Sequence, residues 1–266
     1  MSLLFSYWLK RPRFGLLTVF LITLSGCAMQ AQQDVLAGTY LGPPVAIGQG
    51  QAATFVTLDA RGQAQTLGIR MSEAALSGLP AEGDPPHGAK EYTLHLPTEA
   101  KGTGYDHVTL DWNPRGHIPE GVYDVPHFDF HFYMVDEHLR EGITATGEDL
   151  AIAHTVPPAN EMPADYVLPP GTEVAKMGAH AIDPSSDEFN QKPFTYTFIY
   201  GYYDGRMIFM EPMVSLEYLR SRPEMFVKVK QPEVYVQKVH YPTRFGVRYY
   251  AGEQHYEITL EGLVPR

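Results

Sequence analysis

The sequence predicts a mainly β fold, either an antiparallel sandwich or a barrel, with a few short helices. Three observations support this prediction. Most runs rich in β-branched and aromatic residues are short and end at Gly, Pro, Asn or Asp. Asp204-Gly205 separates two such runs and is a strong hairpin signal, because both residues tolerate positive φ. The chain contains no internal repeat, heptad pattern or long amphipathic helix.

Runs of strand-forming residues between turn signals place the individual strands. In chain order we expect them at residues 53–59, 63–70, 91–96, 107–112, 127–133, 195–203, 206–214, 225–230, 233–240, 246–250 and 255–260. With a two-residue turn at Asp204-Gly205, Glu211 should lie opposite Phe198 in the hairpin. The resulting sheets should enclose one core.

Helices and loops fill the remaining chain. Residues 72–79 should form a short helix with Ser72 as its N-cap, and residues 215–222 a second one that ends before Pro223. Loops are expected at residues 80–89, at 113–121 and at the proline-rich stretch 157–171.

The N-terminus has the parts of a secretory leader. The first 15 residues include three basic residues and no acidic one, and an apolar run from Leu16 to Leu24 follows. That run is too short to span a bilayer as a mature helix but suits an export signal. It ends in L-S-G-C, which resembles the bacterial lipobox, where the cysteine is lipidated after cleavage. We therefore predict that residues 1–26 are a lipoprotein signal peptide.

Cys27 then decides the expected location of the protein. It is the only cysteine, so no disulfide can form within one chain. An uncleaved anchor or a free buried thiol are the alternatives to lipidation. Ala28 follows, where an Asp would resemble an inner-membrane retention signal. We expect a cell-envelope protein attached to the membrane through the lipid on Cys27, at the outer membrane and facing the periplasm. Residues 27–37 would be a tether and residues 38–266 a single β-rich domain.

The charge of the chain narrows the range of partners. The sequence has 20 Lys and Arg against 31 Asp and Glu, a net charge of −11. Three of the basic residues lie in the leader, so the mature chain would carry −14. An acidic body argues against nucleic acid as a partner and against electrostatic docking to anionic lipid.

An alternating stretch carries the strongest functional signal. Residues 126–133 read P-H-F-D-F-H-F-Y. Because side chains alternate faces along a strand, its phenylalanines should form an apolar row and His127, Asp129 and His131 the opposite row. A solvent-exposed sheet face is the alternative, but such faces usually carry Thr, Lys, Glu and Ser. We expect Phe130 in the core and a functional site on the other face.

Additional ligands must come from elsewhere in the chain. His180 lies near Asp183 and turn residues, and Glu211 is a carboxylate within an apolar strand that needs a partner if buried. For His117 a surface loop position and a role in the site are equally good interpretations. We predict that at least three of His127, Asp129, His131, His180 and Glu211 converge on one pocket.

The mixture of imidazole and carboxylate predicts the kind of ligand. It suits Zn²⁺ or another divalent transition metal better than Ca²⁺ or Mg²⁺. Positions two apart on a strand are roughly 6.6 Å apart, so neighbours in the polar row can share an ion more easily than its two ends. His131 is the first choice as a ligand. Binding should weaken below the ordinary imidazole pKa of about 6.5.

The segments that carry these residues resemble a known family. They are D-W-N-P-R-G-H-I-P-E-G-V-Y-D-V-P-H-F-D-F-H-F-Y at 111–133, M-G-A-H-A-I-D-P at 177–184 and Y-G-Y-Y-D-G-R-M-I-F-M-E-P-M at 200–213. They are similar to the TTHB-type domain of unknown function of bacterial envelope proteins. Its prototype is a Thermus protein linked to an extracytoplasmic stress sigma factor. The resemblance extends over most of the mature chain. It implies an exported, β-rich domain that self-associates as a homo-oligomer, and it implies no reaction.

Motifs of common enzymes are absent from the sequence. It has no G-x-S-x-G, H-E-x-x-H, P-loop or dinucleotide fingerprint. Three functions stay open: an envelope lipoprotein with a divalent-metal site, a metal-dependent enzyme with a cupin-like or carbonic-anhydrase-like site, and a structural envelope oligomer without metal. In the enzyme, Asp129 or Glu211 would be the base.

Overall fold

A computed structural model describes residues 37–84 and 88–266. The predicted signal peptide, Cys27 and nearly all of the tether lie outside the described residues, as does His87. Within the described part of the chain, no helix has both the length and the apolar character needed to cross a membrane.

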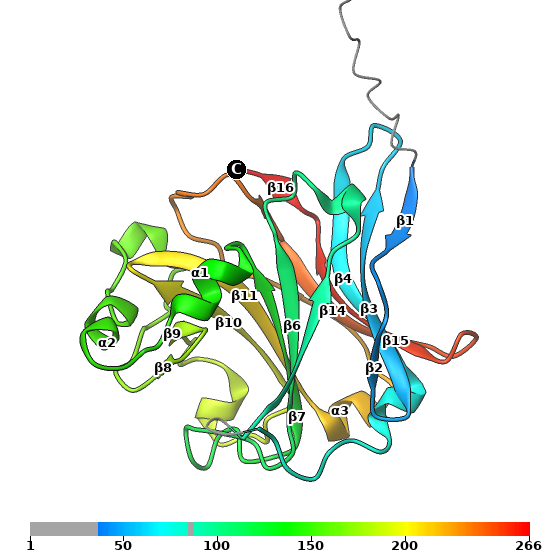
Figure 1. The fold of residues 1–266 in the computed structure, drawn as a ribbon, viewed down its shortest axis with the longest axis horizontal. Coiled ribbons are helices and arrows are strands. Elements are labelled where there is room, and N and C mark those ends of the chain that lie inside the picture. The colour runs from blue at the N-terminus through cyan, green and yellow to red at the C-terminus, as the bar shows by residue number, and fades with distance from the viewer. Residues whose placement is uncertain (1–36, 85–87) are drawn as a thin grey trace, which may run out of the picture. The chain divides into compact units, whose positions relative to one another are not determined.

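Two seven-stranded sheets form the body of the domain, and all of their strand pairs are antiparallel (Figure 1). In the first sheet the order is β1 (Gly38–Leu41), β3 (Gly50–Leu58), β4 (Ala64–Ser72), β15 (His255–Glu261), β14 (Arg244–Tyr250) and β12 (Glu224–Lys228), with β2 (Val45–Ile47) paired to β3. In the second sheet it is β5 (Lys90–His95), β6 (His107–Asn113), β7 (His127–Tyr133), β11 (Arg206–Ser215), β10 (Tyr196–Tyr203), β9 (Gly178–Ala181) and β8 (Glu173–Val174). The predicted mainly β class is confirmed.

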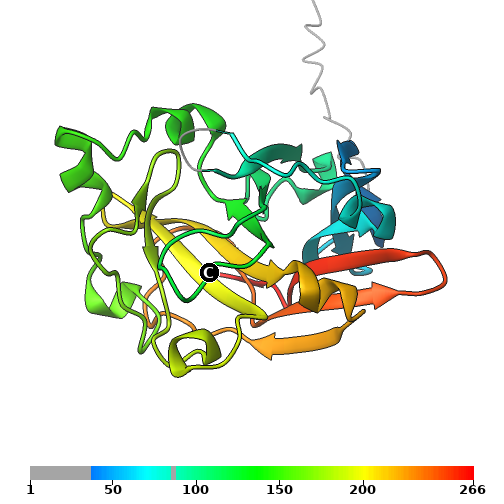
Figure 2. The same ribbon diagram turned by 90° about the horizontal axis from the view of Figure 1, so that it is seen from below.

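One apolar core joins the two sheets. Phe128, Phe130 and Phe132 of β7 are completely buried in it. Across the interface, the rings of Phe198 in β10 and Phe245 in β14 lie 5.1 Å apart between centroids. Figure 2 shows the yellow strands of the second sheet beside the red and orange strands of the first. The phenylalanine row of β7 therefore faces the core, as its alternation predicted.

A bulge in the β10–β11 hairpin sets the face that Glu211 occupies. Tyr202 pairs with Met207, but Gly201 pairs with Phe209, so Ile208 is an extra residue in β11. Glu211 consequently lies opposite Ile199. The prediction that Glu211 lies opposite Phe198 was wrong, because it assumed a regular hairpin without a bulge.

Short segments cover the outer face of the second sheet. In Figure 1, α1 (Glu137–Gly142), α2 (Glu148–Ala153) and β8 lie on one side of β10 and β11, and the first sheet lies on the other. The 3-10 helices η3 (Ala159–Glu161) and η4 (Asp187–Asn190) belong to the same long connections. Asp136 caps α1 by accepting a hydrogen bond from the Leu139 amide at 2.8 Å. Neither α1 nor α2 was predicted, because six residues are too few to show helical periodicity.

Three further elements test the predicted helices and strands. Helix α3 (Leu216–Arg220) forms as expected, and Ser215 accepts a hydrogen bond from the Tyr218 amide at 3.2 Å. Residues 72–79 contain only a 3-10 turn, η1 (Glu73–Leu76), and the Ser72 hydroxyl accepts a hydrogen bond from the Gln51 amide instead of capping it. A second 3-10 turn, η2 (Thr98–Ala100), follows β5.

The prediction of a strand at residues 233–240 was wrong. Within that segment only His240 belongs to a strand, the two-residue β13 (His240–Tyr241), which pairs with β16 (Val264–Pro265). The Val234 amide donates to the Asn160 carbonyl at 2.8 Å, so this backbone is tied to a distant loop rather than to a neighbouring strand.

Candidate metal centre

The outer face of the second sheet carries a buried polar layer. Strand register aligns Thr109, Asp111 and Asn113 of β6 with His131, Asp129 and His127 of β7, respectively. On β11, Glu211 follows Met210, the partner of Phe132, and so stands beside His131. All seven of these polar side chains belong to residues that are at most 4% exposed. The alternative of a wet sheet face is excluded, because the covering segments keep this layer from solvent.

A cavity of about 550 Å³ opens between this layer and its cover. Four of the five predicted ligands line it, namely Asp129, His131, His180 and Glu211. His127 does not line the cavity; it is completely buried with its Nε2 3.2 Å from Asp129 Oδ1. The cavity falls in the range of about 300–1,000 Å³ typical of small-molecule sites.

His131, His180 and Glu211 form the first cluster that could hold a metal ion. The Nε2 atom of His131 lies 3.3 Å from Glu211 Oε1, and that of His180 lies 3.9 Å from Glu211 Oε2. One ligand atom from each residue lies within 4.8 Å of the others. Two imidazoles and one carboxylate form a common ligand set for Zn²⁺ and for Fe²⁺.

Hydrogen bonds orient both rings of this cluster. His180 Nδ1 lies 2.7 Å from the Thr172 carbonyl. The carbonyl can only accept, so Nδ1 donates and the neutral ring keeps its lone pair on Nε2. His131 Nδ1 lies 3.2 Å from Thr109 Oγ1 and 3.5 Å from Asp111 Oδ2. Support of this kind behind an imidazole is what metal-binding histidines usually have.

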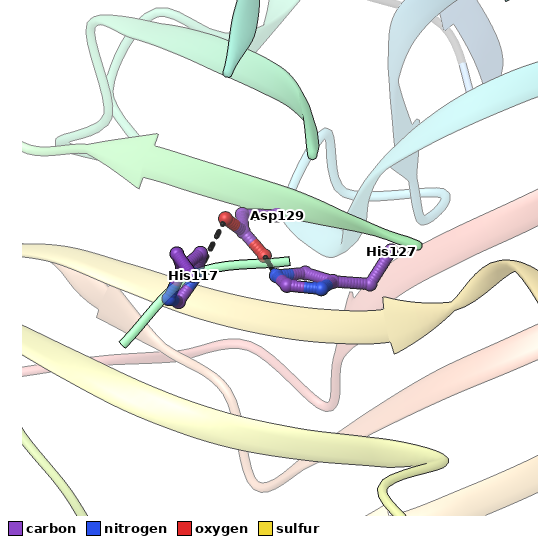
Figure 3. Close-up of side chains that lie close together, drawn as sticks. All are labelled: His117, His127 and Asp129. Atoms are coloured by element: carbon purple, nitrogen blue, oxygen red, sulfur yellow. Dashed lines mark hydrogen bonds and ion pairs between the residues drawn. The ribbon is translucent and has the colours of Figure 1, made fainter. Parts of the chain in front are cut away.

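His117, His127 and Asp129 form a second cluster of the same composition (Figure 3). His117 Nε2 lies 3.3 Å from Asp129 Oδ2, and His127 Nε2 lies 3.2 Å from Asp129 Oδ1. Both histidines direct Nδ1 at a backbone carbonyl 2.7 Å away, that of Ile118 and of Val125. Asp129 therefore stands between two imidazoles, one on its own strand and one on a loop.

Burial makes the imidazoles of the first cluster neutral. It lowers the pKa of His131 to about 3 and that of His180 to about 4. Burial, together with Asp129 and Asp111, raises the pKa of Glu211 well above its ordinary value. A divalent cation would remove the cost of ionising Glu211 and would find both imidazoles unprotonated.

The other two carboxyl groups differ in environment. Burial, together with Glu91 and Asp129, raises the pKa of Asp111 well above its ordinary range. Burial has the same tendency at Asp129, but His127 and His117 outweigh it and lower the pKa of Asp129. Asp129 is thus ionised in the pocket wall.

Several buried atoms of this layer have no hydrogen-bond partner among the described residues. They are His127 Nε2, Asp129 Oδ1, Glu211 Oε2 and both carboxylate oxygens of Asp111. A buried polar atom without a partner destabilises a fold by about 1–3 kcal/mol, and more if it is charged. His127 Nε2, Asp129 Oδ1 and Glu211 Oε2 belong to the two clusters, which fits the binding of a cation there. Asp111 Oδ2 lies 3.5 Å from Nδ1 of His131.

Sequence reasoning missed Asp111 and left His117 undecided. Asp111 belongs to the polar row of β6, where it alternates with Leu110 and Trp112, so the pattern used for β7 would have found it. His117 lies on a loop whose path the sequence does not show. Asp183 stays outside the site, because it pairs with Lys230 at 2.7 Å.

Comparison with known proteins identifies a family for one segment. Neither the curated proteins nor the solved structures contain a match to the chain. The segment 59–112 matches the TTHB210-like family model, described as "Hypothetical protein TTHB210". It runs from the end of β3 to β6 and stops just before the loop of His117 and strand β7. Residues 59–112 are thus similar to the TTHB210-like family, a family of unknown function.

Proposed function

We propose that this chain is an exported, lipid-anchored envelope protein that binds a divalent transition metal through His131, His180 and Glu211. One observation carries the proposal: the Nε2 atoms of two buried, neutral imidazoles face the two oxygens of one buried carboxylate at 3.3 and 3.9 Å. Two lone pairs directed at Glu211 are unfavourable when this carboxyl group is ionised. A cation between them turns this arrangement into a ligand set.

The donor types favour zinc or a similar ion. Ca²⁺ prefers about six to eight oxygen ligands, and Mg²⁺ usually keeps several waters. Imidazole with carboxylate suits Zn²⁺, Fe²⁺ and their neighbours. The ion would serve storage, sensing or local stability at the wall of the cavity.

The leader supports the envelope location. Basic residues, a short apolar run and L-S-G-C occur in the order of a lipoprotein signal. Lipidation of Cys27 would place the domain at the outer membrane on its periplasmic side. From the family resemblance we also propose that the protein self-associates into a homo-oligomer.

Metal-dependent catalysis is the second candidate, and the cavity favours it. Three protein ligands leave a tetrahedral ion one position for water or substrate. His131, His180 and Glu211 all line the same cavity of about 550 Å³, which has room for a small molecule. Asp129, ionised and in the same wall, would be the base.

Zinc titration tests the proposed site. We expect the metal-free full chain, purified in detergent, to bind Zn²⁺ at neutral pH. Loss of a residue that only supports a ligand lowers metal affinity by about 10–100-fold. In His131→Ala, which loses a ligand itself, the zinc affinity of this site should fall by more than that. His138→Ala is the matched control, because His138 is exposed on α1. Equal affinity of His131→Ala and the control would refute the site.

A further inference from the structure

We infer that the chain binds a second divalent metal ion at His117, His127 and Asp129, next to the proposed ion at His131. The second site rests on its own atoms and goes beyond the proposed function. Asp129 and His131 are successive residues on one face of β7, so the two sites would be neighbours at a spacing of roughly 6.6 Å along the strand.

The contact between His127 and Asp129 is the main evidence. His127 Nδ1 donates to the Val125 carbonyl at 2.7 Å, so the neutral ring presents a lone pair at Nε2. That atom lies 3.2 Å from Asp129 Oδ1, and neither atom has a hydrogen bond among the described residues. With the ring neutral, the Nε2 lone pair and the Oδ1 oxygen are both available as ligands of a cation bound between them.

Asp129 is held in a geometry that leaves one oxygen available. Asn113 donates to Asp129 Oδ2 at 2.7 Å from the neighbouring strand. The amide fixes the plane of the carboxylate and directs Oδ1 toward His127. A ligand whose second oxygen accepts a hydrogen bond is the usual form of a metal-binding carboxylate.

The loop that carries His117 is anchored against the rest of the site. Residues 117 and 123 form an isolated antiparallel bridge. Gly116 has a positive φ of +72° and lies beside this bridge. A Cβ atom at this position would come within 1.9 Å of the Tyr123 carbonyl oxygen. The rings of His117 and His127 pack edge to face with centroids 4.7 Å apart. His117 therefore reaches Asp129 from a constrained turn, and its side chain is 29% exposed, which gives an ion a path from solvent.

The polar layer holds enough carboxyl groups to serve more than one ion. Asp111, Asp129 and Glu211 place three buried carboxyl groups on one sheet face. Arg140, a cation near this layer, already contacts Glu91 and Glu141. If all three carboxyl groups were ionised next to bound metal, one divalent ion would balance two of the three charges, whereas two ions would balance all of them. Asp111 faces Asp129 in the strand register and lies 3.5 Å from His131 Nδ1, so it stands between the two clusters.

Metal stoichiometry tests the inference. The metal-free full chain in detergent is equilibrated with Zn²⁺ at neutral pH, and zinc and protein are quantified after dialysis. We expect two zinc ions per wild-type chain, one in His117→Ala, one in His131→Ala and none in the double variant. His138→Ala should keep two. Because His117 lies on a partly exposed loop, its loss should leave the circular dichroism spectrum unchanged.

The outcomes separate this inference from the proposed function. One zinc ion per wild-type chain that His131→Ala removes and His117→Ala retains would overturn the second site and leave the first. One ion with the reverse dependence would support the second site and refute the first. No bound zinc would refute both, since the atoms of His117, His127 and Asp129 would then form only a charge-assisted hydrogen-bond cluster.

Discussion

His131 and Glu211 stand on neighbouring strands with Nε2 of the imidazole 3.3 Å from Oε1 of the carboxylate. Neither residue is more than 2% exposed. Thr109 lies on the opposite side of the imidazole, with Oγ1 3.2 Å from Nδ1. Strands fix all three side chains, so a cation can bind with little rearrangement. The same arrangement makes the charge of Glu211 a cost to the metal-free fold.

Glu211→Gln should stabilise the metal-free protein. Burial raises the pKa of Glu211 above its ordinary value of 4.5, so the unfolded chain loses this proton at a lower pH than the folded chain. Stability is therefore lost as the pH rises above about 4.5 and through the raised pKa. We expect Glu211→Gln to melt at a higher temperature than wild type at neutral pH and to lose this advantage below pH about 4.5.

Thermal melts of chelator-treated protein across this pH range provide the measurement. Glu253→Gln, at an exposed turn residue, should show no such pH-dependent advantage. With excess Zn²⁺ the order should reverse, because only wild type retains the carboxylate ligand. A wild type as stable as Glu211→Gln at neutral pH without metal would contradict the prediction.

Zinc bound at His131 and His180 should persist well below pH 6.5. The sequence predicts that binding weakens below about pH 6.5 because the imidazoles become protonated. Burial disfavours the imidazolium, and the metal-free pKa values are about 3 for His131 and about 4 for His180, so protons should compete with the metal for the imidazoles only near pH 4. Glu211 has a raised pKa, so a bound ion must displace the proton of this carboxyl group at higher pH. Zinc retained by His117→Ala after dialysis at stepwise lower pH measures this site alone. Release centred near pH 6.5 would contradict the prediction.

Phe130→Ala should cost about 3–5 kcal/mol of unfolding free energy. Phe130 is completely buried between the sheets, so truncation leaves a cavity that the neighbouring strands cannot close. Chemical denaturation of the metal-free protein gives the value without a contribution from bound ions. Val236→Ala, at a residue that is 59% exposed, should change stability little. Similar midpoints for the two variants would show that the Phe130 site can collapse.

Cys27→Ser should abolish lipid attachment and leave the precursor unanchored. The thiol is the only group in the predicted lipobox that can carry the diacylglycerol. Labelled fatty acid incorporation and membrane fractionation measure the effect. Ala28→Asp is the matched change one residue away: it should keep the lipid and shift the protein to the inner membrane. Label in Cys27→Ser equal to wild type would eliminate the lipoprotein interpretation.

Local alternation was enough to predict the two faces of β7. Phe128 and Phe130 lie in the core and His127 and Asp129 on the other side, because a strand's period of two depends only on neighbouring residues. The same reasoning placed most of the other strands.

The pairing of residues on different segments could not be predicted from local sequence patterns. The bulge at Ile208 shifts the hairpin by one residue and turns Glu211 from the expected Phe198 to Ile199. A one-residue shift moves a side chain to the other face. Nothing local in R-M-I-F-M-E marks this extra residue. His117 reaches Asp129 through a turn closed by a long-range bridge, so its place also depends on the folded chain.

The alternation along β7 separates two kinds of mutational sensitivity. A saturation scan of residues 127–133 should show a period of two: changes at the even positions would appear as lost expression, and changes at the odd positions 127, 129 and 131 as lost ligand with expression kept. Relatives that share the scaffold are then free to replace the odd positions. A relative that keeps the phenylalanine row but has other residues at positions 127, 129 and 131 would share the fold of this chain but not its ligand-binding site.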